Sequence, residues 1–371
     1  MSDPLFRPFT AGALSLRNRI VMAPMGQGKA VAGLPDARYV DYFRARAEGE
    51  TGLIISGTAA IDHPLAPLDE NEPHLHGSAL PTWGKVVAAV HACGGHIMPQ
   101  LGHAGLQGLA PAPPPWNGFG PSGLWMQGAQ IGTEPVSEVR GAPMTLAQIE
   151  EVIAAFVRGA EAAKALGFDG VEIHGAHGFL IDQFLWAHTN RREDHYGAER
   201  SRFAAEIVSA CRSAVGPDFP ILFRFSQFKM TDYAARLAET PADLEAVLRP
   251  LVDAGVTLFD CSQRRFWRPE FDGSTLNLAG WVKKMSGRPT MGGGGIGLEK
   301  TSLEYGETGV YMHVASASTA HLDDVRDRLD RGEFDLVTVG RAILGDPQWA
   351  HKVRTGATDT LQPYGPEVLA W

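Results

Sequence analysis

The chain of 371 residues lacks three features that would each point to a class of protein. No apolar run reaches the roughly 18 to 20 residues that a membrane-spanning helix needs, so no membrane partner is expected. The three cysteines, Cys93, Cys211 and Cys261, lie far apart, which excludes a disulfide framework and a Cys-x-x-Cys metal site. Nucleic acid is not expected as a partner either, because 33 Lys and Arg face 42 Asp and Glu and give a net charge of −9.

Two sequence signals are also missing. The first ten residues contain no basic segment followed by an apolar one, so we expect no secretory signal and a cytoplasmic location. No Gly-x-Gly-x-x-Gly motif follows the first expected strand, which weighs against a doubly wound dinucleotide-binding sheet. The chain does have 43 glycines and a hydrophobic fraction of 44%, which is enough for a large core and excludes a disordered chain.

Short apolar segments alternate with longer amphipathic ones along the chain. The segments expected as strands are Arg19–Met22, Gly52–Ser56, Ile97–Leu101, Gly170–His174, Ile221–Phe225, Leu258–Cys261, Pro289–Met291 and Leu336–Val339. The segments expected as helices are Tyr39–Ala47, Trp83–Cys93, Leu146–Leu166, Ser201–Val215, Leu244–Ala254, Leu278–Met285 and Leu322–Arg331. Strands that are apolar throughout are typical of a parallel sheet covered on both faces. The pattern predicts an α/β fold, a (β/α)8 TIM barrel, with the doubly wound open sheet as the alternative.

We expect a single domain over residues 1–371, with two insertions in its loops. Ala110–Ser137 is rich in Pro, Gly and Gln and follows the third strand, so it is expected to form a long loop or small hairpin over the C-terminal face of the barrel. Glu304–Ala317 is expected to be a second insertion.

Glycines or polar residues follow every expected strand, at the end of the barrel where TIM-barrel active sites lie. Gly292–Gly295 follows the seventh strand and Gly340-Arg341 follows the eighth, the two loops that commonly bind phosphate in this fold. Glycine N–H groups and a guanidinium would hold a phosphate there. The alternative is that the glycines only form a tight turn.

His174 and His177 stand three residues apart at the end of the fourth strand. They could be a metal pair, a pair of donors to a carbonyl or phenolate oxygen, or two histidines packed in a loop. We expect Glu172 to point to the opposite face of the strand from His174, which leaves the pair without a third ligand, and no metal is predicted.

Arg224 lies on an apolar strand, so its charge must have a partner. That partner is either an internal carboxylate, Asp260 or Glu172, or an electron-rich atom of a cofactor. The spacing alone leaves both alternatives open.

Several motifs together carry a family resemblance over nearly the whole chain. They are Asn18–Met25, Gly52–Ser56, Pro99–Leu101, Asp169–Gly178, Asp182–Leu185, Thr189–Arg192 and Gly340–Pro347. With these motifs the sequence resembles the old yellow enzyme family of FMN-dependent ene-reductases, which are NADH:flavin oxidoreductases.

The resemblance implies noncovalent FMN, with NADH or NADPH as electron donor and an α,β-unsaturated carbonyl compound as acceptor. It places these residues at the cofactor: Pro24, Met25, Gly26, Thr58, Gln100, Arg224, Gly292, Gly293, Gly294, Gly340 and Arg341. Arg224 would stabilise the anionic reduced flavin. His174 and His177 would be the catalytic pair that donates hydrogen bonds to the substrate oxygen while hydride passes from flavin N5 to the β-carbon.

Two positions depart from the family pattern. Phe179 stands where the family usually has a tyrosine that protonates the substrate, and a phenyl ring has no proton to give. Gly26 stands where the family usually has the Thr or Cys that tunes the flavin. Either water delivers the proton, or the reaction differs. The alternatives are an amine or C–C oxidase or dehydrogenase, and a non-redox double-bond isomerase.

The loop Arg264–Arg268 places aromatic and basic residues after the sixth strand. We expect Trp267, together with Phe179, to line a pocket for a small-molecule substrate. The arginines could instead bind the phosphates of the nicotinamide cofactor, or the loop could pack in a homodimer interface.

Overall fold

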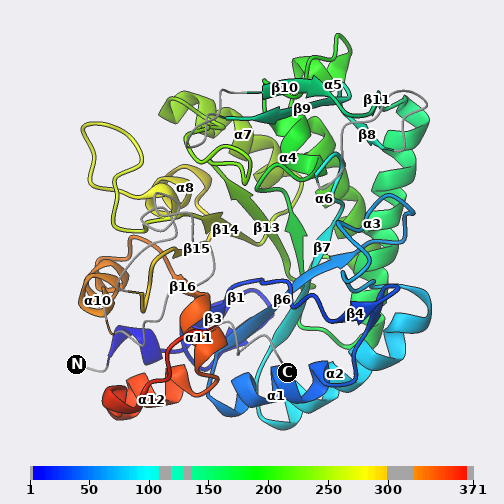
Figure 1. The fold of residues 1–371 in the computed structure, drawn as a ribbon. Coiled ribbons are helices and arrows are strands. Elements are labelled where there is room, and N and C mark those ends of the chain that lie inside the picture. The colour runs from blue at the N-terminus through cyan, green and yellow to red at the C-terminus, as the bar shows by residue number, and fades with distance from the viewer. Residues whose placement is uncertain (1–2, 108–117, 129–135, 299–318, 320, 366–371) are drawn as a thin grey trace.

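The computed structural model of the chain describes residues 3–107, 118–128, 136–298, 319 and 321–365. Its centre is a closed barrel of eight parallel strands in the order β12-β13-β14-β15-β16-β3-β6-β7 (Figure 1). The barrel strands are β3 (Ile20–Met22), β6 (Leu53–Ala60), β7 (Ile97–Gly102), β12 (Val171–His174), β13 (Ile221–Ser226), β14 (Leu258–Ser262), β15 (Thr290–Gly293) and β16 (Leu336–Val339). All eight expected strands are found, and the predicted (β/α)8 barrel is confirmed.

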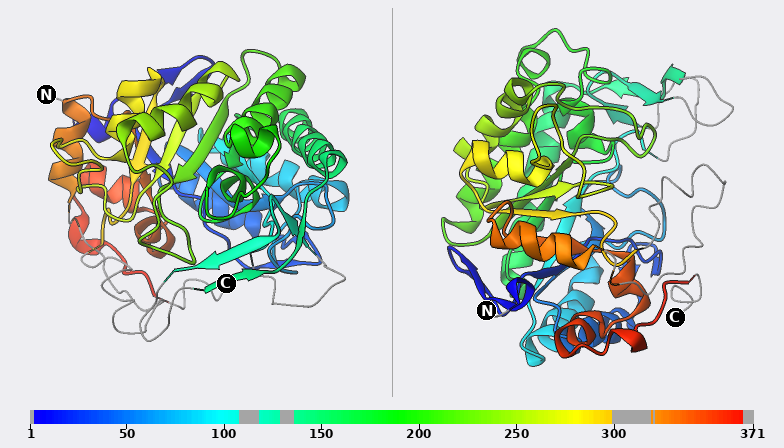
Figure 2. Two further views of the ribbon diagram at one scale, coloured as in Figure 1. Left: turned by 90° about the horizontal axis from the view of Figure 1, so that it is seen from above. Right: turned by 90° about the vertical axis from the view of Figure 1, so that its left-hand side faces the viewer.

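Helices surround the barrel on the outside (Figure 2). They are α1 (Tyr39–Glu48), α2 (Leu80–Ala92), α3 (Leu146–Leu166), α4 (Leu180–Leu185), α5 (His195–Ala198), α6 (Arg202–Val215), α7 (Pro241–Asp253), α8 (Leu278–Ser286), α10 (Leu322–Asp330), α11 (Arg341–Gly345) and α12 (Trp349–Thr355). The longest, α3, begins with a capping box in which the side chains of Thr145 and Gln148 satisfy each other's backbone N–H groups, and it ends at the left-handed Gly167. None of the helices in the described ranges is long and apolar enough to cross a membrane.

Short hairpins and turns complete the fold. They are β1 (Phe9–Ala11), β2 (Leu14–Leu16), β4 (Ala30–Val31), β5 (Leu34–Pro35), β8 (Phe119–Gly120), β9 (Leu124–Gln127), β10 (Val136–Val139), β11 (Ala142–Pro143) and the 3₁₀ turns Pro4–Phe6, Gly77–Ala79 and Thr358–Thr360. The described part of the expected 110–137 insertion contains β9, which pairs antiparallel with β10 at the top of Figure 1. The expected insertion at 304–317 lies outside the described residues.

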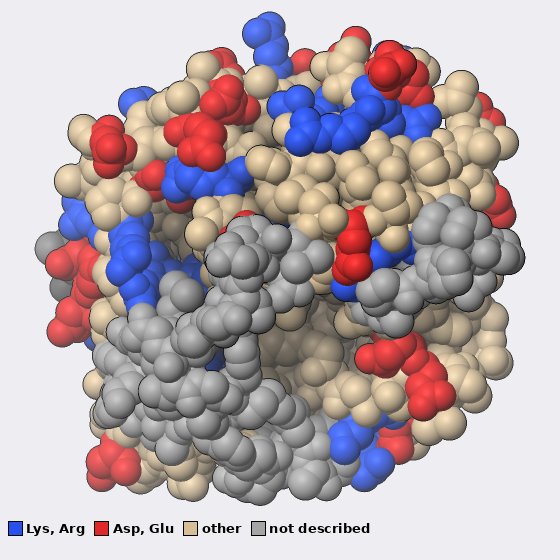
Figure 3. All heavy atoms as spheres, turned by 45° about the horizontal axis from the view of Figure 1, so that its top comes forward, with Lys and Arg blue, Asp and Glu red and all other residues tan. Residues whose placement is uncertain are grey.

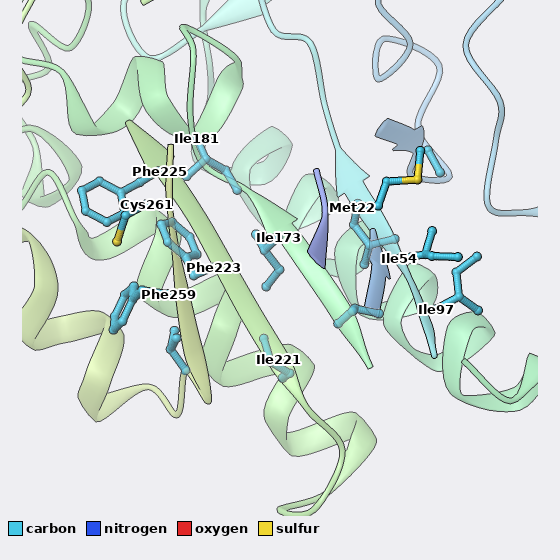
Figure 4. Close-up of a cluster of buried hydrophobic side chains, with 14 of the residues drawn as sticks. Met22, Ile54, Ile97, Ile173, Ile181, Ile221, Phe223, Phe225, Phe259 and Cys261 are labelled. Carbon is cyan, nitrogen blue, oxygen red and sulfur yellow. The ribbon is translucent and has the colours of Figure 1, made fainter. Parts of the chain in front are cut away.

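The core consists of two separate apolar layers. The outer one lies between the strands and the helices and includes Ile173, Phe223 and Phe259 (Figure 4). The inner one fills the floor of the barrel with one or two residues from most strands. Its members are Val21, Leu53, Ile55, Met98, Leu222, Leu258, Met291 and Leu336, closed from below by Phe9, Leu14 and Leu16 of the β1–β2 hairpin. Because side chains alternate along a strand, both layers come from the same continuously apolar segments.

Candidate active site

Two adjoining cavities lie at the C-terminal ends of the barrel strands, where the surface is hollowed (Figure 3). The first, of about 540 Å³ including its open part, is bordered by the loops after β14, β15 and β16, and we call it the glycine cavity. The second, of about 710 Å³, is bordered by His174, His177 and Phe179, and we call it the histidine cavity. Arg224 borders both, so the two form one continuous site.

The glycine cavity owes its shape to backbone segments in close contact. A Cβ atom on Gly293 would lie 2.3 Å from the carbonyl oxygen of Thr338, and one on Gly294, at φ +119°, would lie 2.1 Å from that of Gln263. Side chains are therefore excluded at both positions, and the backbone stays accessible. Gly340 and Arg341 border the same cavity. Backbone N–H groups beside a guanidinium suit a phosphate group.

Gly292, also expected at the phosphate, faces elsewhere. Its missing side chain leaves room for helix α8, because a Cβ atom there would lie 3.0 Å from the Cβ of Ala279. It is not among the described residues that border the glycine cavity. For this one glycine, packing accounts for the residue type.

Arg224 has the internal carboxylate partner that its sequence position allowed, and it also borders the site. Its Nε lies 3.2 Å from Oδ2 of Asp260, and the two side chains are 11% and 1% exposed. Its Nη2 donates to Ser262 Oγ at 3.3 Å. The guanidinium is thus paired inside the barrel while it faces both cavities, so it can present positive charge to a bound group.

Our expectation for Glu172 is wrong. Residues 172 and 174 are two apart on β12 and therefore share a face, and Glu172 lies inside the barrel, fully buried. Its Oε1 accepts a hydrogen bond of 2.7 Å from Gln100 Nε2, and its carboxyl group also interacts with that of Asp260. Burial, and then the negative charge of Asp260, raise the pKa of Glu172 well above its usual range. Burial also raises the pKa of Asp260, so the pair holds a proton more firmly than free carboxyl groups do.

His174 and His177 are brought together as expected, with ring centroids 5.3 Å apart in an edge-to-face arrangement. His177 Nε2 lies 2.8 Å from Ser262 Oγ, and His174 Nδ1 is buried without a described partner. Burial and the nearby Arg224 lower the pKa of His174 to about 3 and that of His177 well below its usual range. Both imidazoles are therefore neutral at pH 7, and each can donate one N–H.

The loop that carries His177 is held by a buried ion pair that the sequence did not point to. His177 adopts φ +65°, which is unusual for a residue with a side chain and occurs where surrounding contacts enforce it. Asp182 accepts from Gly178 N at 2.6 Å and from Lys229 Nζ at 2.6 Å, and the Asp182 and Lys229 side chains are fully buried. The Ser226 hydroxyl also accepts from His177 N at 3.0 Å.

Both departures from the family pattern lie at the histidine cavity. The ring of Phe179 is 4.5 Å from that of His174 and is nearly buried. Gly26 borders the same cavity, and a Cβ atom there would meet no heavy atom within 4 Å. The site therefore has room for a Cβ atom at this position.

Of the remaining expected cofactor residues, three border the histidine cavity and one borders neither cavity. Pro24, Thr58 and Gln100 border the histidine cavity, and Thr58 Oγ1 donates to Gln100 Oε1 at 2.8 Å. Gln100 keeps one N–H free for a ligand, because an amide has two and Glu172 takes one. Met25 borders neither cavity, and its sulfur lies beneath Gly340, 3.5 Å from where a Cβ atom would be.

Trp267 does not reach the site. Its ring stacks on His321 with centroids 4.0 Å apart, and it is not among the described residues that border the glycine or histidine cavity. Other residues of its loop, namely Arg264, Arg265 and Arg268, border a third cavity of about 850 Å³, which we call the arginine cavity. This cavity shares Ser262 and Gln263 with the glycine cavity.

One segment at the site was missed by the sequence reasoning. Asn71 and Glu72, in the loop between β6 and α2, border the histidine cavity. The available signal was an acid-rich run, Asp69–Glu72, following a barrel strand. No group of three or more potential metal ligands occurs in the part of the chain that the structure describes.

Comparisons with known proteins place this site in a family. Residues 4–360 match the model of the NADH:flavin oxidoreductase / NADH oxidase family. The chain is 31% identical to an NADH oxidase of Thermoanaerobacter brockii over 96% of its own length and 52% of that relative's. It is 30% identical to an NADPH dehydrogenase of Geobacillus thermodenitrificans, over 95% and 94% of the two chains.

A solved structure of morphinone reductase in complex with tetrahydroNAD is also similar, with a TM-score of 0.77, 26% identity, and 98% and 93% of the two chains covered. The chain belongs to the NADH:flavin oxidoreductase / NADH oxidase family, and the resemblance to old yellow enzyme is confirmed. The chain spans about half the length of the Thermoanaerobacter relative.

Proposed function

We propose that this protein is an FMN-dependent oxidoreductase that takes reducing equivalents from NADH or NADPH and reduces the alkene of an α,β-unsaturated carbonyl compound. One observation carries the proposal. The glycine cavity and the pair of neutral histidines meet at one mostly buried arginine, Arg224.

The residues present fit FMN. Thr338 borders the glycine cavity and His174 borders the histidine cavity, and Thr338 Oγ1 and His174 Nδ1 are buried without described partners. A ligand that supplies polar atoms would satisfy them. We assign the phosphate to Gly293, Gly294 and the Gly340-Arg341 pair. We assign the ring to Pro24, Gly26, Thr58, Gln100 and Arg224. Bound there, FMN would supply two-electron hydride chemistry.

The two histidines position and polarise the substrate. As neutral groups, His174 and His177 each donate one N–H to the carbonyl oxygen, where negative charge grows as hydride reaches the β-carbon. Removing one such donor costs about 3 kcal/mol of transition-state stabilisation in comparable sites. Phe179 closes the cavity beside them and supplies no proton.

Two further proposals concern the protein as a whole. We propose that it works in the cytoplasm and forms a homodimer. Light scattering of the purified protein tests the second point, because a monomer mass at micromolar concentration would contradict it.

The reaction is tested by following the flavin spectrum in two anaerobic half-reactions. Bleaching by NADH or NADPH, followed by reoxidation with cyclohexenone, is expected. His174→Ala is expected to slow the reoxidation about 100-fold with little effect on the bleaching. Bleaching by an amine, with no response to either nicotinamide, would overturn the proposal in favour of an amine dehydrogenase.

A further inference from the structure

Reduction of an alkene needs a proton as well as a hydride, and the structure identifies where the proton can come from. Phe179 occupies the position that would carry the acid, and its ring packs on His174. His174 and His177 are poor sources, because each is a neutral imidazole whose remaining N–H would leave a buried anion.

Glu72 borders the same cavity as His174, His177 and Phe179. Its loop is fixed by backbone hydrogen bonds on both sides, from Ala30 N to Asn71 O at 3.2 Å and from Ala60 N to Pro73 O at 2.8 Å. The backbone on either side of Glu72 is therefore tied to β4 and to the barrel strand β6. One carboxyl oxygen, Oε2, accepts from the backbone N–H of Leu68, so the other oxygen can face a substrate.

The surroundings of Glu72 favour the protonated carboxyl group. The side chain is half-buried, and burial raises its pKa to about 7. The hydrogen bond from the Leu68 N–H opposes this shift, and the negative charge of Asp69 adds to it. Glu72 also contributes, after burial, to the raised pKa of Tyr39 in α1. Across the cavity, the histidines are neutral and Arg224 is paired with Asp260. A general acid is most effective when its pKa lies near the working pH.

We propose that Glu72 is the acid that protonates the substrate's α-carbon in place of the hydroxyl that Phe179 lacks. This inference rests on the proposed function. When hydride forms the new C–H bond at the β-carbon, the π electrons of the alkene shift to form an enolate held by His174 and His177. The α-carbon then takes the proton of the Glu72 carboxyl group, and the enolate electrons re-form the carbonyl. Glu72 is left as a carboxylate and recovers a proton from water at the cavity mouth.

The first test measures reoxidation of the reduced enzyme by cyclohexenone across a pH series. The wild-type rate is expected to fall above an apparent pKa of about 7, because the carboxyl group must be protonated. Glu72→Gln is expected to lower the rate about 100-fold and to remove this pH dependence, with flavin bleaching by NADPH unchanged. The matched control is Glu70→Gln, the same change at an exposed neighbour outside the cavity, which is expected to behave as wild type.

A rescue experiment separates a proton donor from a structural residue. In Glu72→Gln/Phe179→Tyr a phenol replaces the lost acid at the neighbouring position, and the rate is expected to recover at least tenfold. A Glu72→Gln enzyme with the wild-type rate and pH profile would overturn the inference, and so would failure of the rescue in a folded, FMN-bound variant.

A measurement without FMN or turnover tests the acid itself. Because the pKa of Glu72 is raised in the folded state, its contribution to stability is full at low pH and is lost as pH rises from about 4.5 to about 7. The stability of the apoprotein relative to Glu72→Gln should therefore fall over that range. A flat difference would overturn the inference even in an active enzyme. An enzyme that cyclohexenone does not reoxidise, but that keeps this slope, would instead contradict the proposed function.

Discussion

The floor and the mouth of the barrel are built from the same strands but from opposite kinds of residue. On four strands, an apolar residue of the floor is followed two positions later, on the same face of the strand, by a polar residue of the mouth. These pairs are Met98 and Gln100, Leu222 and Arg224, Leu258 and Asp260, and Leu336 and Thr338. The floor residues fill the barrel, and the mouth residues border cavities. The fold thus needs only one layer of these strands for inward packing, and the next layer is available for chemistry.

The mouth contains groups that a purely structural layer would avoid. Thr338 Oγ1 is buried without a described hydrogen-bond partner, and the carboxyl groups of Glu172 and Asp260 are buried in contact with each other. A buried, unsatisfied polar group costs about 1 to 3 kcal/mol. A bound ligand can offset such a cost at the mouth but not in the floor, so the comparison predicts opposite responses to mutation in the two layers.

The largest effect on stability is expected at the buried ion pair beneath the histidine loop. Lys229→Met leaves Asp182 buried and unpaired, and should lower the free energy of unfolding by about 3 to 5 kcal/mol in urea titrations of the apoprotein. Asp182→Leu/Lys229→Met removes both charges and should recover much of the loss. A loss of about 1 kcal/mol or less, as for an exposed pair, would show that the mouth does not depend on this support.

A matched pair on β16 tests the comparison itself. Leu336→Ala in the floor should cost about 2 to 5 kcal/mol of unfolding free energy and leave the Kd of FMN unchanged. Thr338→Val, two residues on, removes an unsatisfied hydroxyl and should leave stability equal or about 1 kcal/mol higher, while the Kd of FMN rises severalfold. If both variants lose stability alike, the two layers do not differ in the way described.

The arginine cavity extends the mouth outward with positive charge. Arg264 stacks on Tyr233 at 3.8 Å and on Phe228 at 5.4 Å, and the Phe228 ring lies 5.1 Å from that of His177. Replacing Arg265 and Arg268 by Gln should raise the Kd of NADPH about tenfold, because charged hydrogen bonds to its phosphates are lost. Rapid-mixing reduction with 1-benzyl-1,4-dihydronicotinamide, which has no phosphate, is the control and should be unaffected. If the substitutions slow flavin reduction equally with both electron donors, they have changed the shape of the cavity rather than removed phosphate contacts.

The smallest effect on stability is expected at Gly26. Because a Cβ atom there meets no heavy atom within 4 Å, Gly26→Thr should change unfolding free energy by no more than about 0.5 kcal/mol. The rate of flavin reduction should nevertheless change, since the new hydroxyl would face the bound ring. A destabilised variant with unchanged kinetics would mean that the position serves packing.

The sequence predicted the barrel well because its signal is local. The strands are short and largely apolar, and the longest helix, α3, has capping signals at both ends. The histidine pair and Arg224 were found for the same reason, as polar residues at the ends of apolar strands. Glu172 was assigned to the wrong face of its strand. Residues two apart share a face, so it lies on the same side as His174, inside the barrel.

Contacts between loops that are far apart in the chain could not be predicted from the sequence. The Asp182–Lys229 pair joins residues 47 apart, and no local pattern marks either as a partner of the other. Trp267 was expected at the substrate because it follows a strand, yet its loop turns it onto His321. Glu72 was passed over because one acid in an acidic run carries no signal until the cavity brings it beside His174.

The central claim is that both histidines and the flavin ring share one cavity, and a phenol titration tests it most directly. Adding 4-chlorophenol to the FMN-loaded protein should produce a long-wavelength charge-transfer band, because the histidine N–H groups hold the phenolate oxygen over the oxidised ring. The band should disappear in His174→Ala/His177→Ala while FMN stays bound. A wild-type protein with bound FMN and no such band, or a band that survives the double substitution, would contradict the account.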